Sequence, residues 1–96
     1  MADGKKYDVI KTTIANGVSD QAQVFTDCSE FITVEIKNIE TTAARVLKFY
    51  LNGETTKIYE LGADEIFFEE HLKINAIHLT NDSGDVINFQ IYVVGF

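Results

Sequence analysis

Three side chains in this sequence of 96 residues could take part in covalent chemistry: Cys28, His71 and His78. A cysteine activated by a histidine can act as a nucleophile, but the reactive thiolate forms near positive charge. Cys28 is flanked instead by Asp27 and Glu30, whose negative charges raise the pKa of a thiol. We therefore predict that Cys28 is a small loop or core residue with no catalytic role.

One stretch of the chain gathers side chains that can ligate divalent ions: Asp64, Glu65, Glu69, Glu70 and His71. Their spacing matches no specific metal motif, and acidic residues beside a hydrophobic strand ordinarily form a solvated rim. The Asp-Ser-Gly-Asp segment at 82–85 resembles part of a calcium loop, but the further acidic ligands and the closing Glu are absent. We expect a turn at 82–85 and no metal site.

Serine and glycine patterns supply no other catalytic candidate. Ser19, Ser29 and Ser83 lie in polar turn contexts without a G-x-S-x-G elbow, and no glycine spacing matches a phosphate-binding loop. The sequence thus predicts a non-enzymatic protein with no catalytic residue, no metal and no cofactor. A row of exposed tyrosines among Tyr50, Tyr59 and Tyr92 would instead suit a carbohydrate-binding module, which is the alternative function.

The charge of the chain limits its partners. The formal net charge is −7, and the eight Lys and Arg residues are scattered, whereas binding to a phosphate backbone depends on clustered cations. No nucleic acid and no membrane partner are expected, since an acidic surface repels anionic lipids and no apolar run approaches about 18 residues. The first residues show no signal-peptide pattern and a lone cysteine forms no internal disulfide, so synthesis in a cytoplasm is expected.

Apolar residues at every second position, bounded by Gly, Asn, Asp or Ser, predict consecutive antiparallel strands. The clearest strand is 31–38, where Ile32, Val34 and Ile36 should share one face. Further strands are expected over 6–14, 22–25, 45–51, 55–61, 66–68, 72–80 and 86–96. The apolar residues of 72–80 change phase, so a bulge or kink is expected near 75–76.

Two of these strands should form a hairpin around the Asn-Gly pair at 52–53, because Asn-Gly favours a two-residue turn. One register puts Tyr50 near Thr55 and Lys48 near Lys57, although bulges could shift it.

Together the strands predict an all-β protein, an antiparallel β-sandwich that is jelly-roll-like, with about seven or eight short strands and no long helix. The length fits a single domain over 1–96, with 1–30 interpreted as an N-terminal arm plus the first strands. The last strand is apolar on both faces at its end, so another chain should cover part of it. We predict a subunit interface at Tyr92, Val94 and Phe96.

The order of features over 31–96 resembles small virion proteins of tailed bacteriophages and prophages. These features are ITVEIKN, KFYLNG, LGADE, FFEEHLKINAIHL, DSGD and the closing VINFQIYVVGF. The resemblance implies a structural subunit of a phage virion, such as a capsid decoration or minor head or tail protein. It also implies a location in the virion after synthesis in the host cytoplasm, with other virion proteins and a homo-oligomer, first of all a trimer, as partners.

Overall fold

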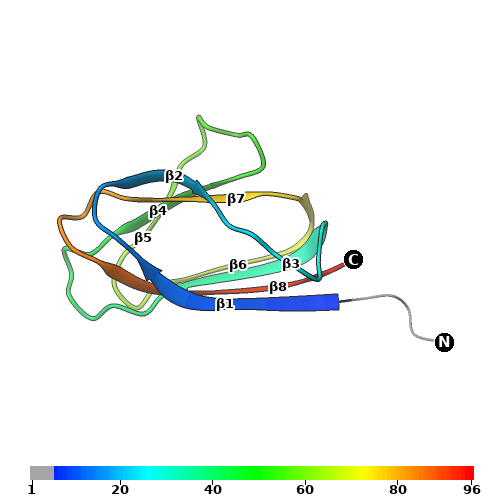
Figure 1. Ribbon diagram of the computed structural model, residues 1–96, viewed down its shortest axis with the longest axis horizontal. Coiled ribbons are helices and arrows are strands. Elements are labelled where there is room, and N and C mark those ends of the chain that lie inside the picture. Colours follow the sequence, from blue (N-terminus) through cyan, green and yellow to red (C-terminus); the bar gives the residue numbers. More distant parts are fainter. Residues whose placement is uncertain (1–5) are drawn as a thin grey trace.

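The computed structural model describes residues 6–96, apart from the side chains of His71 and Leu72. In this part the chain forms eight strands in two four-stranded sheets that lie face to face (Figure 1). The strands are β1 Lys6–Ile14, β2 Val18–Ala22, β3 Phe31–Asn38, β4 Leu47–Leu51, β5 Tyr59–Leu61, β6 Ile66–Ile74, β7 Ile77–Asn81 and β8 Ile87–Gly95. The first sheet has the order β1-β8-β3-β6 and the second sheet the order β2-β7-β4-β5.

This arrangement confirms the predicted antiparallel β-sandwich. Every pair of neighbouring strands is antiparallel, and the chain passes repeatedly from one sheet to the other, as in a jelly roll. The first and last strands, β1 and β8, lie side by side. Across residues 6–96 the structure contains no helix long and apolar enough to span a membrane.

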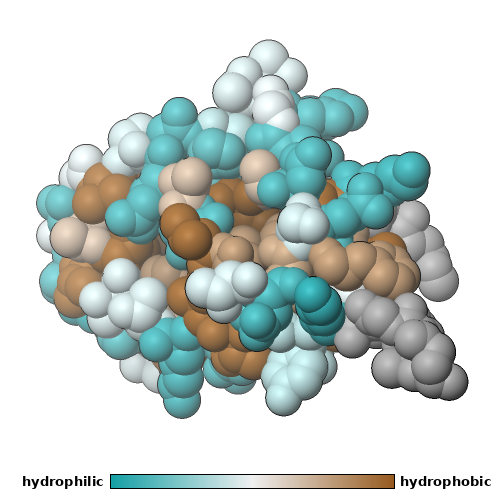
Figure 2. All heavy atoms as spheres, turned by 45° about the vertical axis from the view of Figure 1, so that its right-hand side comes forward, coloured by the Kyte–Doolittle hydropathy of each residue, from teal (hydrophilic) through white to brown (hydrophobic). Residues whose placement is uncertain are grey.

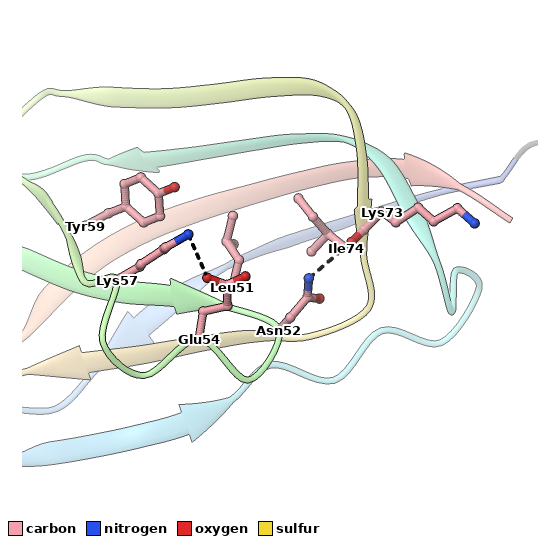
Figure 3. A pocket seen from close by; sticks show the side chains of 7 residues that line it. All are labelled: Leu51, Asn52, Glu54, Lys57, Tyr59, Lys73 and Ile74. Atoms are coloured by element: carbon pink, nitrogen blue, oxygen red, sulfur yellow. Dashed lines mark hydrogen bonds and ion pairs between the residues drawn. The ribbon is translucent and has the colours of Figure 1, made fainter.

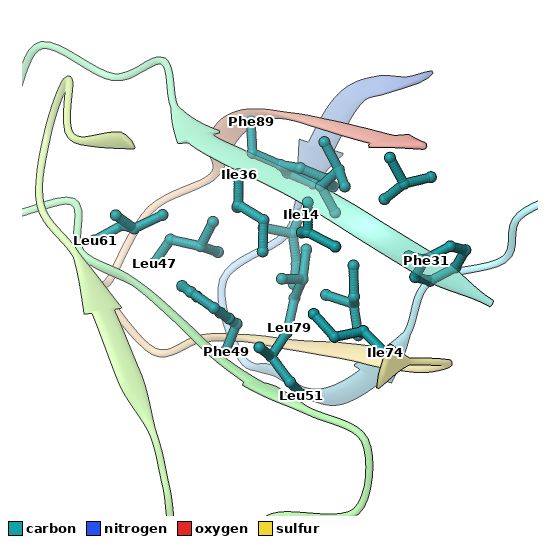
Figure 4. Close-up of a cluster of buried hydrophobic side chains, with 14 of the residues drawn as sticks. Ile14, Phe31, Ile36, Leu47, Phe49, Leu51, Leu61, Ile74, Leu79 and Phe89 are labelled. Atoms are coloured by element: carbon teal, nitrogen blue, oxygen red, sulfur yellow. The ribbon is translucent and has the colours of Figure 1, made fainter. Parts of the chain in front are cut away.

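The hydrophobic core fills the space between the two sheets. Figure 4 shows Ile36 and Phe89 of the first sheet lying across from Leu47, Phe49 and Leu79 of the second sheet. These side chains are no more than 1% exposed. Because burying one side chain of this size stabilises a fold by about 1.5–3 kcal/mol, this cluster is the main source of stability.

The alternation in β3 and β8 decides which side chains enter the core. In β8 every second side chain from Ile87 to Val93 is buried. In β3 Val34 and Ile36 are buried, but Ile32 is only half-buried while Phe31 is fully buried. A β-bulge at this point shifts the register, so Phe31 rather than Ile32 fills the core.

The predicted two-residue hairpin after β4 is wrong. Lys48 pairs with Glu60 rather than with Lys57, and residues 52–58 form a loop. The Asn52 side chain explains the difference, because its Nδ2 donates to the Lys73 carbonyl (3.1 Å) and its Oδ1 accepts from the Asn75 N–H (2.8 Å). These tertiary contacts override the local preference of Asn-Gly for a tight turn.

The phase change predicted near 75–76 is present and marks a crossover. β6 ends at Ile74 in the first sheet, and β7 begins at Ile77 in the second sheet. Ile74 and Ile77 are both buried, so the chain turns over the core at this point.

The first strands lie at the edges of the sandwich. β1 covers the predicted 6–14, whereas the strand expected at 22–25 lies earlier, at β2. Residues 6–22 of the proposed arm therefore supply one edge strand to each sheet. Residues 1–5 of that arm lie outside the described residues.

A buried carboxylate secures the loop between β3 and β4. Glu40 accepts hydrogen bonds from the backbone N–H of Asn88 (2.7 Å), from the side-chain amide of Asn88 (2.6 Å) and from Arg45 (2.8 Å). These donors, the Asn88 N–H first, hold the pKa of Glu40 below its usual value.

Acid should therefore weaken the fold through Glu40. The depressed pKa means that the stabilisation is fully present above the ordinary glutamate pKa and is lost as the pH falls through the lower value of the folded state. In urea unfolding from about pH 7 to about pH 3, the gap in unfolding free energy between the wild type and Glu40→Gln should shrink as the pH falls. A gap independent of pH would contradict this role.

Candidate interaction surface

The outer face of the first sheet carries exposed hydrophobic side chains. Tyr7 pairs with Val94, and Val9 pairs with Tyr92 on the neighbouring strand. Tyr7, Val9 and Tyr92 are 65%, 51% and 36% exposed, and the rings of Tyr7 and Tyr92 are 6.2 Å apart. We call these four residues the tyrosine patch. A contiguous exposed apolar group of this kind marks an interaction site more often than isolated surface residues do.

The far edge of the same sheet carries a second apolar group. Ile66 and Phe68 of β6 are 53% and 51% exposed. They pair with Lys37 and Glu35 of β3, which point to the solvent face of the sheet. Because Glu35 also pairs with Tyr92, a polar strip separates Phe68 from the tyrosine patch.

The edges of the first sheet are open. β1 pairs with β8 over nine consecutive residues without a bulge, and β6 pairs only with β3. In the described residues, no hydrogen bond joins the backbone of 6–13 to any segment besides β8. The sequence has no proline, which is one of the usual protections of an edge strand. Such strands are ready-made templates for pairing with another chain.

Hydrophobic atoms also reach the surface between the two sheets. Figure 2 shows them as a band bordered above and below by hydrophilic residues. Ile10 of β1 and Val18 of β2 are only partly buried against the core, as is Phe25. The side of the sandwich with β1 and β2 is thus incompletely covered in a single copy.

The second sheet has a polar cluster instead. The Tyr50 ring stacks on the His78 ring at 4.7 Å, and the Tyr50 hydroxyl donates a hydrogen bond to Asp20. This hydrogen bond raises the pKa of Tyr50, so the phenol stays protonated. His78 Nδ1 lies 3.0 Å from the Asp20 carboxylate but makes no hydrogen bond with it.

A hollow of about 300 Å³ lies beside the loop at 52–58. Figure 3 shows the side chains that line it. Three of its polar side chains are already engaged, because Lys57 pairs with Glu54 at 3.2 Å and Asn52 binds the Lys73 carbonyl. Tyr59 lines the hollow, but its ring packs on Phe49 with centroids 5.0 Å apart. The hollow therefore presents few free groups to a ligand.

The structure places Cys28 in the loop between β2 and β3, where it is 4% exposed. Burial, followed by the charges of Asp8 and Asp27, raises the pKa of its thiol. The prediction of a small buried residue is confirmed, and such a thiol is a poor nucleophile.

The acidic candidates do not converge on one point. Asp82 pairs with Lys48 at 3.0 Å and Asp85 with Arg45, so the carboxylates of the predicted turn point to different cations. Among the described side chains no group of three or more His, Cys, Asp and Glu could hold a metal ion. The His71 side chain lies outside the described residues.

The exposed row of tyrosines that a carbohydrate site would need is not formed. Tyr50 is 8% exposed, whereas Tyr59 and Tyr92 lie in different sheets. The ring of Tyr92 instead lies 6.2 Å from the ring of Tyr7, a residue that the sequence analysis did not single out. The signal that could have found Tyr7 is its position, two residues before Val9 on the same face of a strand.

The predicted interface residues are only partly brought together. Tyr92 and Val94 lie in the tyrosine patch on β8. Phe96 is 46% exposed and follows β8, where its backbone pairs with Glu30. The interface itself stays a prediction.

Comparison with known proteins gives structural similarity only. No family model and no curated protein matches the sequence. A solved chain from Bacillus endospore appendages, which form a family of disulfide-linked pili, has a TM-score of 0.52 and 10% identity, covering 94% of this chain and 86% of that chain. The crystal structure of PirA has a TM-score of 0.40 and 9% identity, covering 99% and 96%.

These comparisons correct the expectation of a phage virion protein. The similar solved chain comes from Bacillus endospore appendages, so the virion function, the virion location and the virion partners are not supported, nor is the trimer. The earlier resemblance consisted of strands and turns, which unrelated jelly rolls share. At 10% identity the appendage chain establishes a shared fold and nothing further.

Proposed function

We propose that this chain is a non-enzymatic structural subunit that assembles with copies of itself into a filament. The observation that carries the proposal is the first sheet, whose outer face exposes the tyrosine patch and whose edges are open. A monomer would leave this apolar surface and these backbone groups in water. Association with further copies would cover both.

The fold comparison supports the same kind of role. The similar Bacillus chain comes from appendages that form pili, so this type of sandwich can serve as a pilus subunit. Those pili are disulfide-linked, whereas the 96 residues here contain a single cysteine that is buried and has a raised thiol pKa. The contacts we propose are therefore non-covalent, and reducing agents should not dissolve the filament.

The charge of the subunit adds a condition for assembly. With a net charge of −7, neighbouring copies repel one another, and salt screens this repulsion. Assembly should increase with ionic strength, because the apolar contacts do not depend on charge.

The test is the size distribution of the purified chain by light scattering and negative-stain electron microscopy. We expect multimers whose fraction rises with concentration and salt. Tyr7→Ser combined with Tyr92→Ser should lower the association constant between subunits at least about tenfold, since roughly 1.4 kcal/mol of lost contact energy corresponds to that factor.

Val86→Ser is the matched control, because Val86 is 39% exposed but lies in the turn between β7 and β8, away from the tyrosine patch and from the edges of both sheets. It should leave the multimers unchanged. A chain that stays monomeric at high concentration and high salt would refute the proposed function.

A further inference from the structure

The direction of the strands determines how two copies of this chain can join. All pairings of the first sheet are antiparallel and the sheet has four strands, so its edge strands β1 and β6 run in opposite directions. A second copy in the same orientation would therefore place its β1 antiparallel to β6 of the first copy. No rotation between the copies is required.

The second sheet obeys the same rule. It also has four antiparallel strands, with β2 and β5 at its edges. Short connections join β1 to β2 and β5 to β6, so each side of the sandwich carries one open edge from each sheet (Figure 1). One displacement of a copy can thus extend both layers at once.

We propose that β6 of one copy pairs with β1 of the next copy, head to tail, with Phe68 opposite Tyr7 and Ile66 opposite Val9. This inference rests on the proposed function and names the contact that builds the filament. The four residues are between 51% and 65% exposed in a single copy and lie on the same outer face of the sheet. Pairing them brings two aromatic and two aliphatic side chains into contact in adjacent cross-strand pairs.

On the opposite face of the new strand pair, the charged residues favour this register, and Phe67 lies opposite Asp8 in it but opposite Ile10 in the alternative described below. The proposed register places Glu69 opposite Lys6, so that a carboxylate meets an ammonium group. A register shifted by two residues, with Phe68 opposite Val9, places Glu69 opposite Asp8 and Ile66 opposite Lys11. That alternative sets two carboxylates against each other, which is unfavourable. A shift by one residue would turn the apolar side chains to the wrong face.

The contact joins different surfaces of the two copies, and it therefore generates an open chain of subunits rather than a closed dimer. Backbone hydrogen bonds along β1 and β6 would supply affinity, and the side-chain pairs would set the register.

Disulfide trapping tests the register directly. In a Cys28→Ser background, Tyr7→Cys with Phe68→Cys and Val9→Cys with Phe68→Cys are compared after mild oxidation. Both pairs join β1 to β6, which are separated within one copy by β8 and β3, roughly 14 Å, too far for a disulfide inside one chain. The first double variant should give a ladder of covalent multimers on a denaturing gel, at least about tenfold more than the second.

Each of the other outcomes contradicts a different part of the proposal. A ladder from Val9→Cys with Phe68→Cys alone refutes the register, and covalent dimers from either single cysteine variant refute the head-to-tail contact. Multimers that persist while neither pair cross-links refute this contact and leave the proposed function standing. If the unsubstituted chain does not assemble at all, both proposals fail together.

Discussion

Replacing Gly95 by alanine should destabilise the folded protein by about 3 kcal/mol or more. A Cβ atom at Gly95 would lie 1.8 Å from the backbone oxygen of Glu30 and 2.8 Å from Cα of Phe31. Both contacts are with backbone atoms, so no side-chain rotation can relieve them. The expected result is a large decrease in the urea concentration at the midpoint of unfolding, or a chain that does not fold.

The surroundings of Gly95 cannot easily withdraw. The Phe96 N–H donates to the Glu30 carbonyl (2.9 Å), and the Phe96 carbonyl accepts from the Ser29 N–H (2.8 Å). Phe31, which pairs with Gly95, is 1% exposed and packs in the core. Moving the β3 backbone away would break these bonds and displace a buried ring.

Gly53→Ala is the matched control for Gly95. No atom lies within 4 Å of a Cβ built at Gly53, and its φ is not in the left-handed region. Alanine there should change the stability by no more than about 1 kcal/mol. Equal effects of the two substitutions would show that the loss of stability comes from the change in chain flexibility and not from the close approach to Glu30.

The sequence predicts best those strands in which apolar, buried side chains alternate with polar, exposed ones. β3 and β8 are long, and their buried residues recur at every second position, so the period alone locates them. The bulge at Phe31 is not visible in this way, because it arises from pairing with β6 and β8. The loop at 52–58 was mispredicted for a related reason, since the partners of Asn52 lie in a distant segment of the chain.

Two of the four residues of the tyrosine patch could be predicted from the sequence. Tyr92 and Val94 stand out because the last strand is apolar on both faces, but Tyr7 and Val9 join them only through the pairing of the first and last strands. That pairing links residues at opposite ends of the chain, and no local pattern encodes it. The function was not predictable from the same features, because jelly rolls with similar strands and turns serve unrelated purposes.

The sequence did not predict which polar side chains are buried, and Asn81 is the clearest case. It ends β7 and is fully buried. Its Nδ2 donates to the carbonyls of Ile14 (2.9 Å) and Asp85 (2.7 Å), while its Oδ1 accepts from the N–H (3.0 Å) and the hydroxyl (2.7 Å) of Ser83. One amide thus joins the end of β1, the end of β7 and the turn that leads to β8.

Asn81→Ala should therefore lower the free energy of unfolding by about 2–4 kcal/mol, because it removes the buried hydrogen bond to the Ile14 carbonyl together with three further hydrogen bonds of the amide. Asn16→Ala is the control, since its Oδ1 accepts one exposed hydrogen bond from the Gly84 N–H (2.9 Å), and it should cost about 1 kcal/mol or less. Asn81→Asp separates bonding from size at neutral pH, because a carboxylate of the same shape cannot donate to the two carbonyls. Aspartate should be at least as destabilising as alanine, and wild-type stability of Asn81→Asp would refute the role of the two donated hydrogen bonds.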